Sequence, residues 1–354
     1  MGSLDRLRIV ARRLLWASLG LAPVTIVLRF TVDASPTTLF VLSSLALVPL
    51  AWVIGESTEH AAKRAGPGIG GFLNATFGNA PELIISLFAI NQGLFEVVRG
   101  SLTGSVVGNL LLVLGFSLVA GPSTRIDRRS ALIWVGLVLG AAVMFLIVAI
   151  PDWSGDVTQH TLRVLSIPVS IVLLLVYVGT TWLQLRRQKE MHAGAEIGEE
   201  TWPFSTTLLV LTLATAATAA VAEVLVDSLE NFAEHLHVSD FFVAAVVVAI
   251  VGNAAEHGSA VIVAHRNRVK LATEIALSSS AQVAVFLIPA VTILSWTIQP
   301  ITLAFRQVEI AVMGGAALLA ATLLWHGRSS SRRGWVLIAG YVLAAGIFYK
   351  AGGR

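Results

Sequence analysis

The chain of 354 residues contains no cysteine and little charge. The absence of cysteine excludes disulfides, thiol catalysis and thiolate metal sites. Charged residues make up 13% of the sequence, about half of the roughly 25% that is typical of soluble domains. Hydrophobic residues make up 56% and the mean hydropathy is +0.81, so the sequence favours a chain that folds in a lipid bilayer.

Common catalytic motifs are also missing. The sequence has no His-Glu-x-x-His zinc motif, no Gly-x-Ser-x-Gly elbow and no Gly-Lys-Thr/Ser phosphate loop. We therefore expect no enzyme and no cofactor. The net charge of +3 could point to nucleic acid, but most Lys and Arg lie between apolar runs, as expected for residues that set membrane topology. The sequence thus indicates no nucleic-acid partner.

Apolar runs of about 20 residues, the length that spans a bilayer, follow one another along the chain. They lie near residues 9–30, 38–60, 68–93, 101–120, 130–150, 162–185, 204–230, 240–264, 270–296, 301–325 and 334–350. Helices are expected, because a strand barrel would show alternating segments of about ten residues. The predicted fold class is an all-α polytopic membrane protein with about 11 transmembrane helices.

The basic residues predict the orientation. If the N-terminus is cytoplasmic, all but six of the 24 Lys and Arg fall on the cytoplasmic side, as the positive-inside rule requires. The six are Arg29, Arg99, Arg163, Arg306, Lys350 and Arg354. We expect an integral protein of a prokaryotic inner (plasma) membrane, with its C-terminus outside. The first apolar run is expected to stay as a helix rather than to be cleaved as a signal peptide.

An acidic polar stretch divides the chain into two similar parts. The predicted division is an N-terminal transmembrane helix at 1–34, a five-helix repeat at 35–186, a cytoplasmic linker at 187–202 and a second five-helix repeat at 203–354. Five spans per repeat is an odd number, so the two repeats must insert in opposite orientations. Secondary transporters use this inverted arrangement and bind their substrates near the midplane between the repeats.

Each repeat carries one Glu-centred motif, Gly-Asn-Ala-Pro-Glu at 78–82 and Gly-Asn-Ala-Ala-Glu at 252–256. Glu82 and Glu256 lie deep inside apolar spans, where an ionised carboxylate costs about 2.5–3.5 kcal/mol, so both are candidate functional residues. A helix-end Glu that reaches interfacial water is the alternative, and the apolar sequence on both sides of each motif disfavours it.

Asn79 and Asn253 precede these carboxylates by three residues, so each Asn shares a helical face with its Glu. Carboxylate, amide and freed carbonyl oxygens suit Ca²⁺, which takes six to eight oxygens at about 2.3–2.6 Å. When the ion leaves, burial and mutual repulsion of the two carboxylates favour protons as the replacement charge. The four residues are therefore predicted ligands of a site that holds Ca²⁺ or protons in turn.

Further polar residues follow each motif. Asn109 comes 27 residues after Glu82, and Gln282 comes 26 residues after Glu256. Both amides could coordinate the ion or hydrogen-bond the carboxylates. The alternative is that they only form hydrogen bonds that hold neighbouring helices together. The sequence leaves the same choice open for three serines, which could simply permit close packing: Ser105, Ser278 and Ser279.

Three other residues are assigned to proton coupling. Glu56 and Glu223 occupy equivalent places in the second and seventh spans, where helix-end acids are the alternative. His257 follows Glu256 directly and faces away from it by about 100°, so it could carry protons or pack against a neighbouring helix.

The phrases at 71–82 and 250–257 closely resemble the two signature repeats of Ca²⁺/H⁺ antiporters, the proton-coupled branch of the cation/Ca²⁺ exchanger superfamily. The phrases at 108–111 and 278–283 are also similar to that branch. The resemblance implies that the first helix stands apart from a ten-helix transport core. It also implies that Glu82 and Glu256 are the primary ligands, with Asn79 and Asn253 beside them. Glu56 and Glu223 are implied to support proton coupling.

The predicted function is secondary active exchange of Ca²⁺ for H⁺ by alternating access. The expected partners are these two ions and the lipid bilayer, and the sequence indicates no oligomeric state. Pro81 departs from the pattern, because proline there resembles the sodium-coupled branch. A Na⁺/Ca²⁺ exchanger is therefore one alternative. A passive cation channel, which would use similar carboxylates, is the other.

Overall fold

The computed structural model describes residues 14–31, 34–155, 158–191 and 202–352. Within these ranges the regular structure is helical, apart from an isolated antiparallel bridge between Arg125 and Arg328. The predicted all-α fold class is therefore confirmed. Most of the predicted linker at 187–202 and the first residues of the predicted N-terminal segment lie outside the described residues.

The first repeat predicted from the sequence contains α3 to α8. Its helices, with α2 before them, are α2 (Leu21–Thr31), α3 (Pro36–Phe77), α4 (Ala80–Asn91), α5 (Phe95–Val107), the π-helix η1 (Gly108–Val113), α6 (Leu114–Ala120), α7 (Arg128–Ser154) and α8 (Gln159–Met191).

The second predicted repeat contains α9 to α16. Its helices are α9 (Phe204–His235), α10 (Asp240–Val243), the π-helix η2 (Ala244–Val248), α11 (Ala249–Gly252), α12 (Ala254–His265), α13 (Val269–Gln282), the π-helix η3 (Val283–Leu287), α14 (Ile288–Leu294), the 3₁₀-helix η4 (Ser295–Thr297), α15 (Gln307–Leu324) and α16 (Ser331–Ala351).

The number of membrane spans differs from the expected eleven. The described residues form nine helices long and apolar enough to cross a membrane, or ten if the bent pair of 240–252 and 254–265 is one span. The predicted span at 68–93 falls on the end of α3 and on α4, a separate apolar helix of only 12 residues. The break between α3 and α4 accounts for the difference, and eleven spans stay a prediction.

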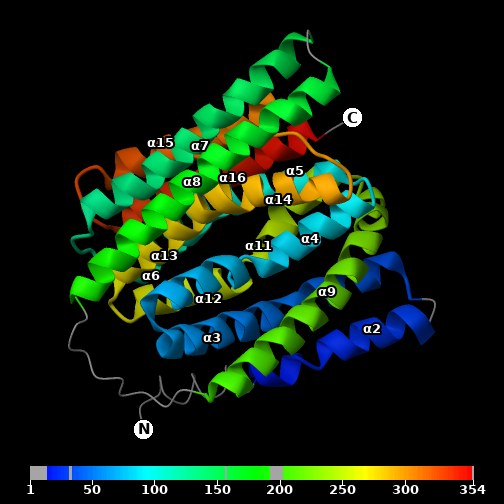
Figure 1. The fold of residues 1–354 in the computed structure, drawn as a ribbon, viewed down its shortest axis with the longest axis horizontal. Coiled ribbons are helices and arrows are strands. Elements are labelled where there is room, and N and C mark those ends of the chain that lie inside the picture. The colour runs from blue at the N-terminus through cyan, green and yellow to red at the C-terminus, as the bar shows by residue number, and fades with distance from the viewer. Residues whose placement is uncertain (1–13, 32–33, 156–157, 192–201, 353–354) are drawn as a thin grey trace.

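Most helices run side by side in one bundle, and their connections gather at two opposite ends (Figure 1). The connections at 121–127, 266–268 and 325–330 lie at the left end of the view, and those at 92–94, 236–239 and 298–306 lie at the right. The left-end connections carry Arg125, Arg266, Arg268 and Arg328. The right-end connections carry Arg306, so most basic residues of these connections lie at the left end. The orientation of the chain in the membrane stays a prediction.

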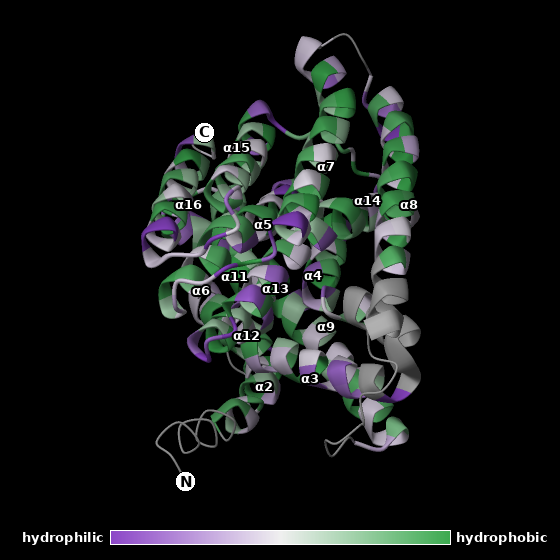
Figure 2. Ribbon diagram, turned by 90° about the vertical axis from the view of Figure 1, so that its left-hand side faces the viewer, coloured by the Kyte–Doolittle hydropathy of each residue, from purple (hydrophilic) through white to green (hydrophobic). Residues whose placement is uncertain are grey.

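The outer surface of the bundle is apolar. Figure 2 shows hydrophobic residues over much of α7, α8 and α15, with hydrophilic residues largely at helix ends and connections. Side chains such as Leu175 of α8 and Leu343 of α16 are about two-thirds exposed, at 65% and 66%. Water disfavours so much exposed apolar area, whereas lipid tails do not. The chain is therefore an integral membrane protein.

The N-terminal helix α2 is peripheral, yet it contacts the bundle. It packs on α3 and α9, and its Arg29 pairs with Asp227 of α9. The helix therefore lies at the edge of the bundle and contacts it through α3 and α9, and its separation from the transport core stays a prediction.

Candidate ion-binding site

Two broken helices carry the two sequence motifs. The helix α3 ends two residues before Asn79, which caps the start of α4. In the second half, α11 ends at Gly252 and Asn253 caps the start of α12, with a bend of 59° between the α10–α11 segment and α12. Pro81 lies in the first turn of α4, where its missing N–H has no intrahelical partner to lose. Discontinuous helices of this kind form the substrate and ion sites of many secondary transporters.

Each break places one carboxylate in the first turn of a helix. Glu82 lies in the first turn of α4 and Glu256 in the first turn of α12. The partial positive charge of a helix N-terminus stabilises a carboxylate at that position. Figure 1 places α4 and α11 near the middle of the bundle, so both motifs are remote from its two ends.

Glu82 is almost completely buried, with 3% of its surface exposed. Neither carboxylate oxygen has a hydrogen-bond partner. The side chain lies against Gly252 of the second half, so closely that a Cβ atom added there would be 3.1 Å from Glu82 Oε1. The absence of a side chain at Gly252 thus lets the carboxylate of one half reach the motif of the other.

Glu256 is partly buried and is held by a relay from the first half. The hydroxyl of Ser279 on α13 donates a hydrogen bond to the Glu256 carboxylate. Asn109 of η1 donates its own amide N–H to that hydroxyl, with 3.0 Å between Nδ2 and Oγ. Asn109 therefore orients Ser279, and Ser279 orients the carboxylate.

A second bond between the halves fixes Asn253. Its Nδ2 donates to Ser105 Oγ of α5 at 2.8 Å and to the Ala249 carbonyl at 2.9 Å. Both Asn253 and Ser105 are buried. Nearby, Ser280 Oγ donates to the Val106 carbonyl at 3.0 Å. The polar residues of α5 and η1 in the first half thus face those of α12 and α13 in the second.

Three π-helical segments lie next to these residues. Asn109 is the second residue of η1, and Gln282 immediately precedes η3. The third segment, η2, leads into α11 and the break at Gly252. Short π-segments within α-helices occur frequently at functional sites, because the extra residue per turn redirects side chains and loosens the backbone.

The hydrogen bonds of the site leave acceptors without donors. Both carboxylate oxygens of Glu82 and the Oδ1 atom of Asn109 are buried and unpartnered. Buried polar atoms are normally paired, and an unpaired carboxylate is especially unfavourable in a bundle interior. A bound cation or proton would satisfy such acceptors. Across the described ranges no three His, Asp or Glu side chains form a metal cluster, so a metal ion would also need amide, hydroxyl or carbonyl oxygens.

Three predicted residues are not joined to this network by any described hydrogen bond. The hydroxyl of Ser278 donates to the Ile275 carbonyl of its own helix at 3.2 Å. Gln282 is partly buried at the end of α13. His257 is partly buried on α12, and its Nε2 atom has no hydrogen-bond partner. The structure therefore distinguishes Ser279 from Ser278, which the sequence did not.

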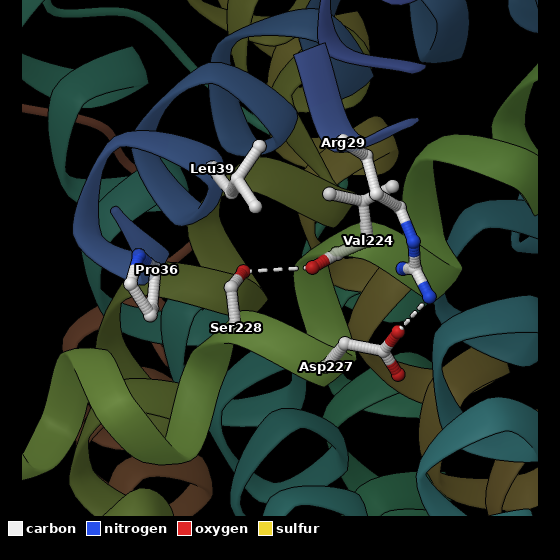
Figure 3. A pocket seen from close by; sticks show the side chains of 6 residues that line it. All are labelled: Arg29, Pro36, Leu39, Val224, Asp227 and Ser228. Atoms are coloured by element: carbon white, nitrogen blue, oxygen red, sulfur yellow. Dashed lines mark hydrogen bonds and ion pairs between the residues drawn. The ribbon is translucent and has the colours of Figure 1, made fainter. Parts of the chain in front are cut away.

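The two predicted proton-coupling acids lie on two helices that pack against each other, α3 and α9. Glu56 is partly buried on α3. Glu223 of α9 has a half-exposed side chain, and Arg29 Nη2 lies 3.9 Å from its Oε1. Arg29 also pairs with Asp227 beside a small cavity between α2, α3 and α9 (Figure 3). Gln92, which follows the last residue of α4, donates to the same carboxylate. Glu223 thus belongs to a charged cluster at the edge of the bundle.

Sequence reasoning missed several polar residues. Ser86 is buried without a hydrogen-bond partner and follows Glu82 by four residues, so its spacing within the apolar span could have identified it. Glu309 is fully buried at the start of α15, and Arg99 and Arg306 approach its carboxylate at 3.8 and 4.0 Å. That cluster joins α5 to α15 at the right end of the bundle in Figure 1, and only the packing of the helices shows it.

The chain is similar to known exchangers along most of its length. The family described as sodium/calcium exchanger protein matches residues 35–186 and again 206–350. The Ca²⁺/H⁺ antiporter ChaA of Bacillus subtilis is 38% identical over 319 residues, covering 87% of this chain and 90% of ChaA. The Ca²⁺/H⁺ antiporter of Synechocystis sp. is 36% identical over 341 residues, covering 88% of this chain and 91% of the relative.

A solved structure shares the fold. The structure of native YfkE superposes with a TM-score of 0.80 at 34% sequence identity, covering 95% of this chain and 98% of YfkE. The same family matches once in each half of the chain, and relatives above 30% identity cover nearly its whole length. The chain belongs to the sodium/calcium exchanger protein family.

Proposed function

We propose that the protein is a secondary active antiporter that exchanges Ca²⁺ for H⁺ across a membrane by alternating access. The Ca²⁺/H⁺ antiporters of Bacillus subtilis and Synechocystis sp. support this assignment through their identity to the chain. Among the family's coupling ions, the proton also agrees with the chemistry of the central carboxylates.

The observation that carries the proposal is the environment of Glu82. Its carboxylate is buried between the two halves with no donor on either oxygen. Glu82 contacts Gly252, and Glu256 follows that glycine by four residues. A divalent cation would neutralise two such carboxylates, and protons would do so when the cation has left. Because either occupant removes the unfavourable charge, the site can switch its access from one side of the membrane to the other when it holds Ca²⁺ or protons.

The other residues receive supporting roles in this proposal. Asn79 and Asn253 are ligands or neighbours of the ion at the two helix breaks. Asn109, Ser105 and Ser279 hold the second carboxylate and its motif in place, and Gln282 and Ser278 remain candidate ligands.

Proton coupling is proposed to extend beyond the two central carboxylates. His257 supports this role because its unpartnered ring nitrogen lies beside the second motif. Glu56 and Glu223 are proposed to pass protons or cations towards the centre. Both acids lie on helices that pack against one another, α3 and α9.

The overall arrangement is part of the same proposal. We infer two inverted five-helix repeats at 35–186 and 203–354, an N-terminal helix at 1–34 and a cytoplasmic linker at 187–202. The two separate family matches and the matching pair of helix breaks support the repeats. The basic residues at one end of the bundle support a cytoplasmic N-terminus in a bacterial inner membrane.

Transport in vesicles tests the proposal. The purified chain is reconstituted in liposomes, and Ca²⁺ uptake is measured with an imposed pH gradient, with a Na⁺ gradient, and with neither. We expect uptake only with the pH gradient and acidification coupled to Ca²⁺ movement. Uptake driven by Na⁺ would instead assign a Na⁺/Ca²⁺ exchanger, and uptake without a counter-ion would assign a channel.

Single cysteines test the orientation. The chain has no cysteine, so Ser123→Cys and Ser154→Cys can be introduced into the otherwise unchanged protein. The two positions lie in the connection before α7 and at the end of α7, and therefore at opposite ends of one span. A membrane-impermeant thiol reagent added to intact cells should label Cys at 154 and spare Cys at 123. The reverse pattern would invert the proposed topology.

A further inference from the structure

Two arginines and one histidine line a recess at the basic end of the bundle. His326, Arg328 and Arg333 line a cavity of about 500 Å³ between the end of α15 and the start of α16. The recess is remote from the two helix breaks, which lie near the middle of the bundle. It therefore requires an explanation separate from ion exchange.

The backbone around the recess is fixed by bonds between the two halves. Ile126 N–H donates to the Gly327 carbonyl at 3.0 Å, and Ser329 N–H donates to the Thr124 carbonyl at 2.8 Å. Gly327 has a φ of +63°, a conformation that glycine adopts without strain. These contacts hold the connection between α15 and α16 against the connection before α7. The recess is thus built on an ordered turn.

Arg333 is positioned by hydrogen bonds to neutral groups. The Arg333 guanidinium donates to the Arg328 carbonyl, and the Arg333 N–H donates to Ser330 Oγ at 3.4 Å. Within the described ranges, no carboxylate forms an ion pair with Arg328 or Arg333. Asp127, the acid closest to the recess along the neighbouring connection, accepts from Ser130 N–H as the N-cap of α7.

A further cation stands nearby, on the first half of the chain. The Arg128 guanidinium lies 4.6 Å from the centre of the Trp325 ring, and a Cβ added at Gly327 would be 3.2 Å from Arg128 Cβ. Like charges held close together repel one another, and the repulsion falls when an anion lies between them. The charge of the recess therefore favours an anionic ligand with several acceptor oxygens, which arginines bind in a planar, bidentate manner.

The surroundings of the recess favour a lipid over a soluble anion. Trp325 and Trp335 are 53% and 59% exposed, as in the aromatic belts that lie at membrane interfaces. Leu318 of α15 and Val342 of α16 present exposed apolar side chains along the same two helices. A headgroup in the recess would leave its acyl chains beside this apolar surface.

We propose that the recess lined by His326, Arg328 and Arg333 binds the phosphate headgroup of an anionic phospholipid. Basic pockets between transmembrane helices are a recognised environment for such headgroups. Arg128 extends the site to the first half, so the lipid contacts both halves at the end where their connections are joined. The binding does not depend on the identity of the exchanged ions.

Native mass spectrometry of the full chain in neutral detergent tests the site. Phosphatidylglycerol and phosphatidylcholine are added in separate titrations, and inorganic phosphate is added as a competitor of phosphatidylglycerol. We expect saturable binding of phosphatidylglycerol and much weaker binding of phosphatidylcholine. The double variant Arg328→Gln/Arg333→Gln should weaken phosphatidylglycerol binding by about tenfold or more, because each charge-assisted bond lost is substantial. Thermal unfolding in detergent without phosphatidylglycerol verifies that the variant is folded.

Arg332→Gln is the matched control, because Arg332 precedes Arg333 on α16, carries the same charge and does not line the recess. It should leave the affinity for phosphatidylglycerol within about twofold of the unaltered protein. An equal loss in the control would overturn the proposal and indicate diffuse surface charge. Equal binding of the two lipids would overturn it as well, and inorganic phosphate that competes as strongly as phosphatidylglycerol would exclude a lipid site.

Discussion

The two motif carboxylates occupy equivalent places in the halves but differ in their partners. Glu82 is buried against Gly252 with both oxygens unpartnered. Glu256 accepts a hydrogen bond from Ser279, which in turn is held by Asn109. The sequence repeat is thus symmetric and the site is not. In this conformation one carboxylate is oriented by a hydroxyl donor, and the other has no donor on either oxygen.

The first prediction removes each charge in turn. Glu82→Gln and Glu256→Gln should each lower Ca²⁺/H⁺ exchange by at least about 30-fold, because removing one charged partner from a buried ion site has a large effect on free energy. The difference between the sites should appear in stability. Glu82→Gln should unfold at a temperature equal to or above that of the unaltered protein, since it removes an unpartnered buried carboxylate.

Exchange is measured in liposomes with equal amounts of protein, and unfolding is followed by near-ultraviolet circular dichroism. Glu59→Gln is a suitable control, because Glu59 is an exposed acid on α3 outside the motifs. Normal exchange by either motif variant would remove that carboxylate from the site. A marked loss of thermal stability in Glu82→Gln would contradict the asymmetry.

The second prediction tests the relay to Glu256. Ser279→Ala deletes the hydroxyl between Asn109 and the carboxylate and should raise the Ca²⁺ concentration for half-maximal exchange by about tenfold. Thr273→Val is the control, because the Thr273 hydroxyl on the same helix donates to the Val269 carbonyl and lies outside the proposed site. Concentration dependence of uptake measures both. If the two variants lost equal affinity, the relay would have no special part in ion binding.

The third prediction fills the space beside Glu82. A methyl group at residue 252 would lie 3.1 Å from Glu82 Oε1, so Gly252→Ala should displace the carboxylate by a few tenths of an ångström. We expect about a fivefold loss of apparent Ca²⁺ affinity, at the lower end of the range for overpacked sites. Gly258→Ala on α12 is the control, since nothing lies within 4 Å of its added Cβ. Equal affinities for the two variants would show that Gly252 tolerates a side chain.

Much of the site could be predicted from the sequence because polar residues are rare in apolar spans. The high free energy of a buried carboxylate identifies Glu82, and spacing from the two motif carboxylates identifies Asn109 and Asn253. The structure places all of them in the bundle interior or at the breaks. In a membrane protein, the high free energy of burying a polar side chain makes such residues informative without any knowledge of packing.

What the sequence could not supply was the choice among neighbours. Ser278 and Ser279 are adjacent, and about 100° of helix rotation decides which one meets Glu256. The pairing of Asn253 with Ser105 depends on which helices pack, over 148 residues of separation. The sequence assigns Glu223 to proton coupling, and only the packing of α2 on α9 shows that it lies beside Arg29 at the edge. Contacts between distant segments follow from tertiary packing, which local pattern does not encode.

The last prediction concerns that edge. Arg29 of α2 pairs with Asp227 and lies 3.9 Å from Glu223, both on α9. These side chains are between a quarter and half exposed, and exposed ion pairs contribute only about 0–1 kcal/mol. Arg29→Gln should therefore change the rate of exchange by about twofold and reduce its dependence on ionic strength, whereas Arg29→Lys should resemble the unaltered protein. If Arg29→Gln lowered the rate of exchange as much as Glu82→Gln, the acids essential for exchange would have to be assigned to the edge of the bundle rather than to its centre. Because Gln92 at the end of α4 bonds to the same Asp227, even a small effect would link the peripheral helix to the helix that carries Glu82.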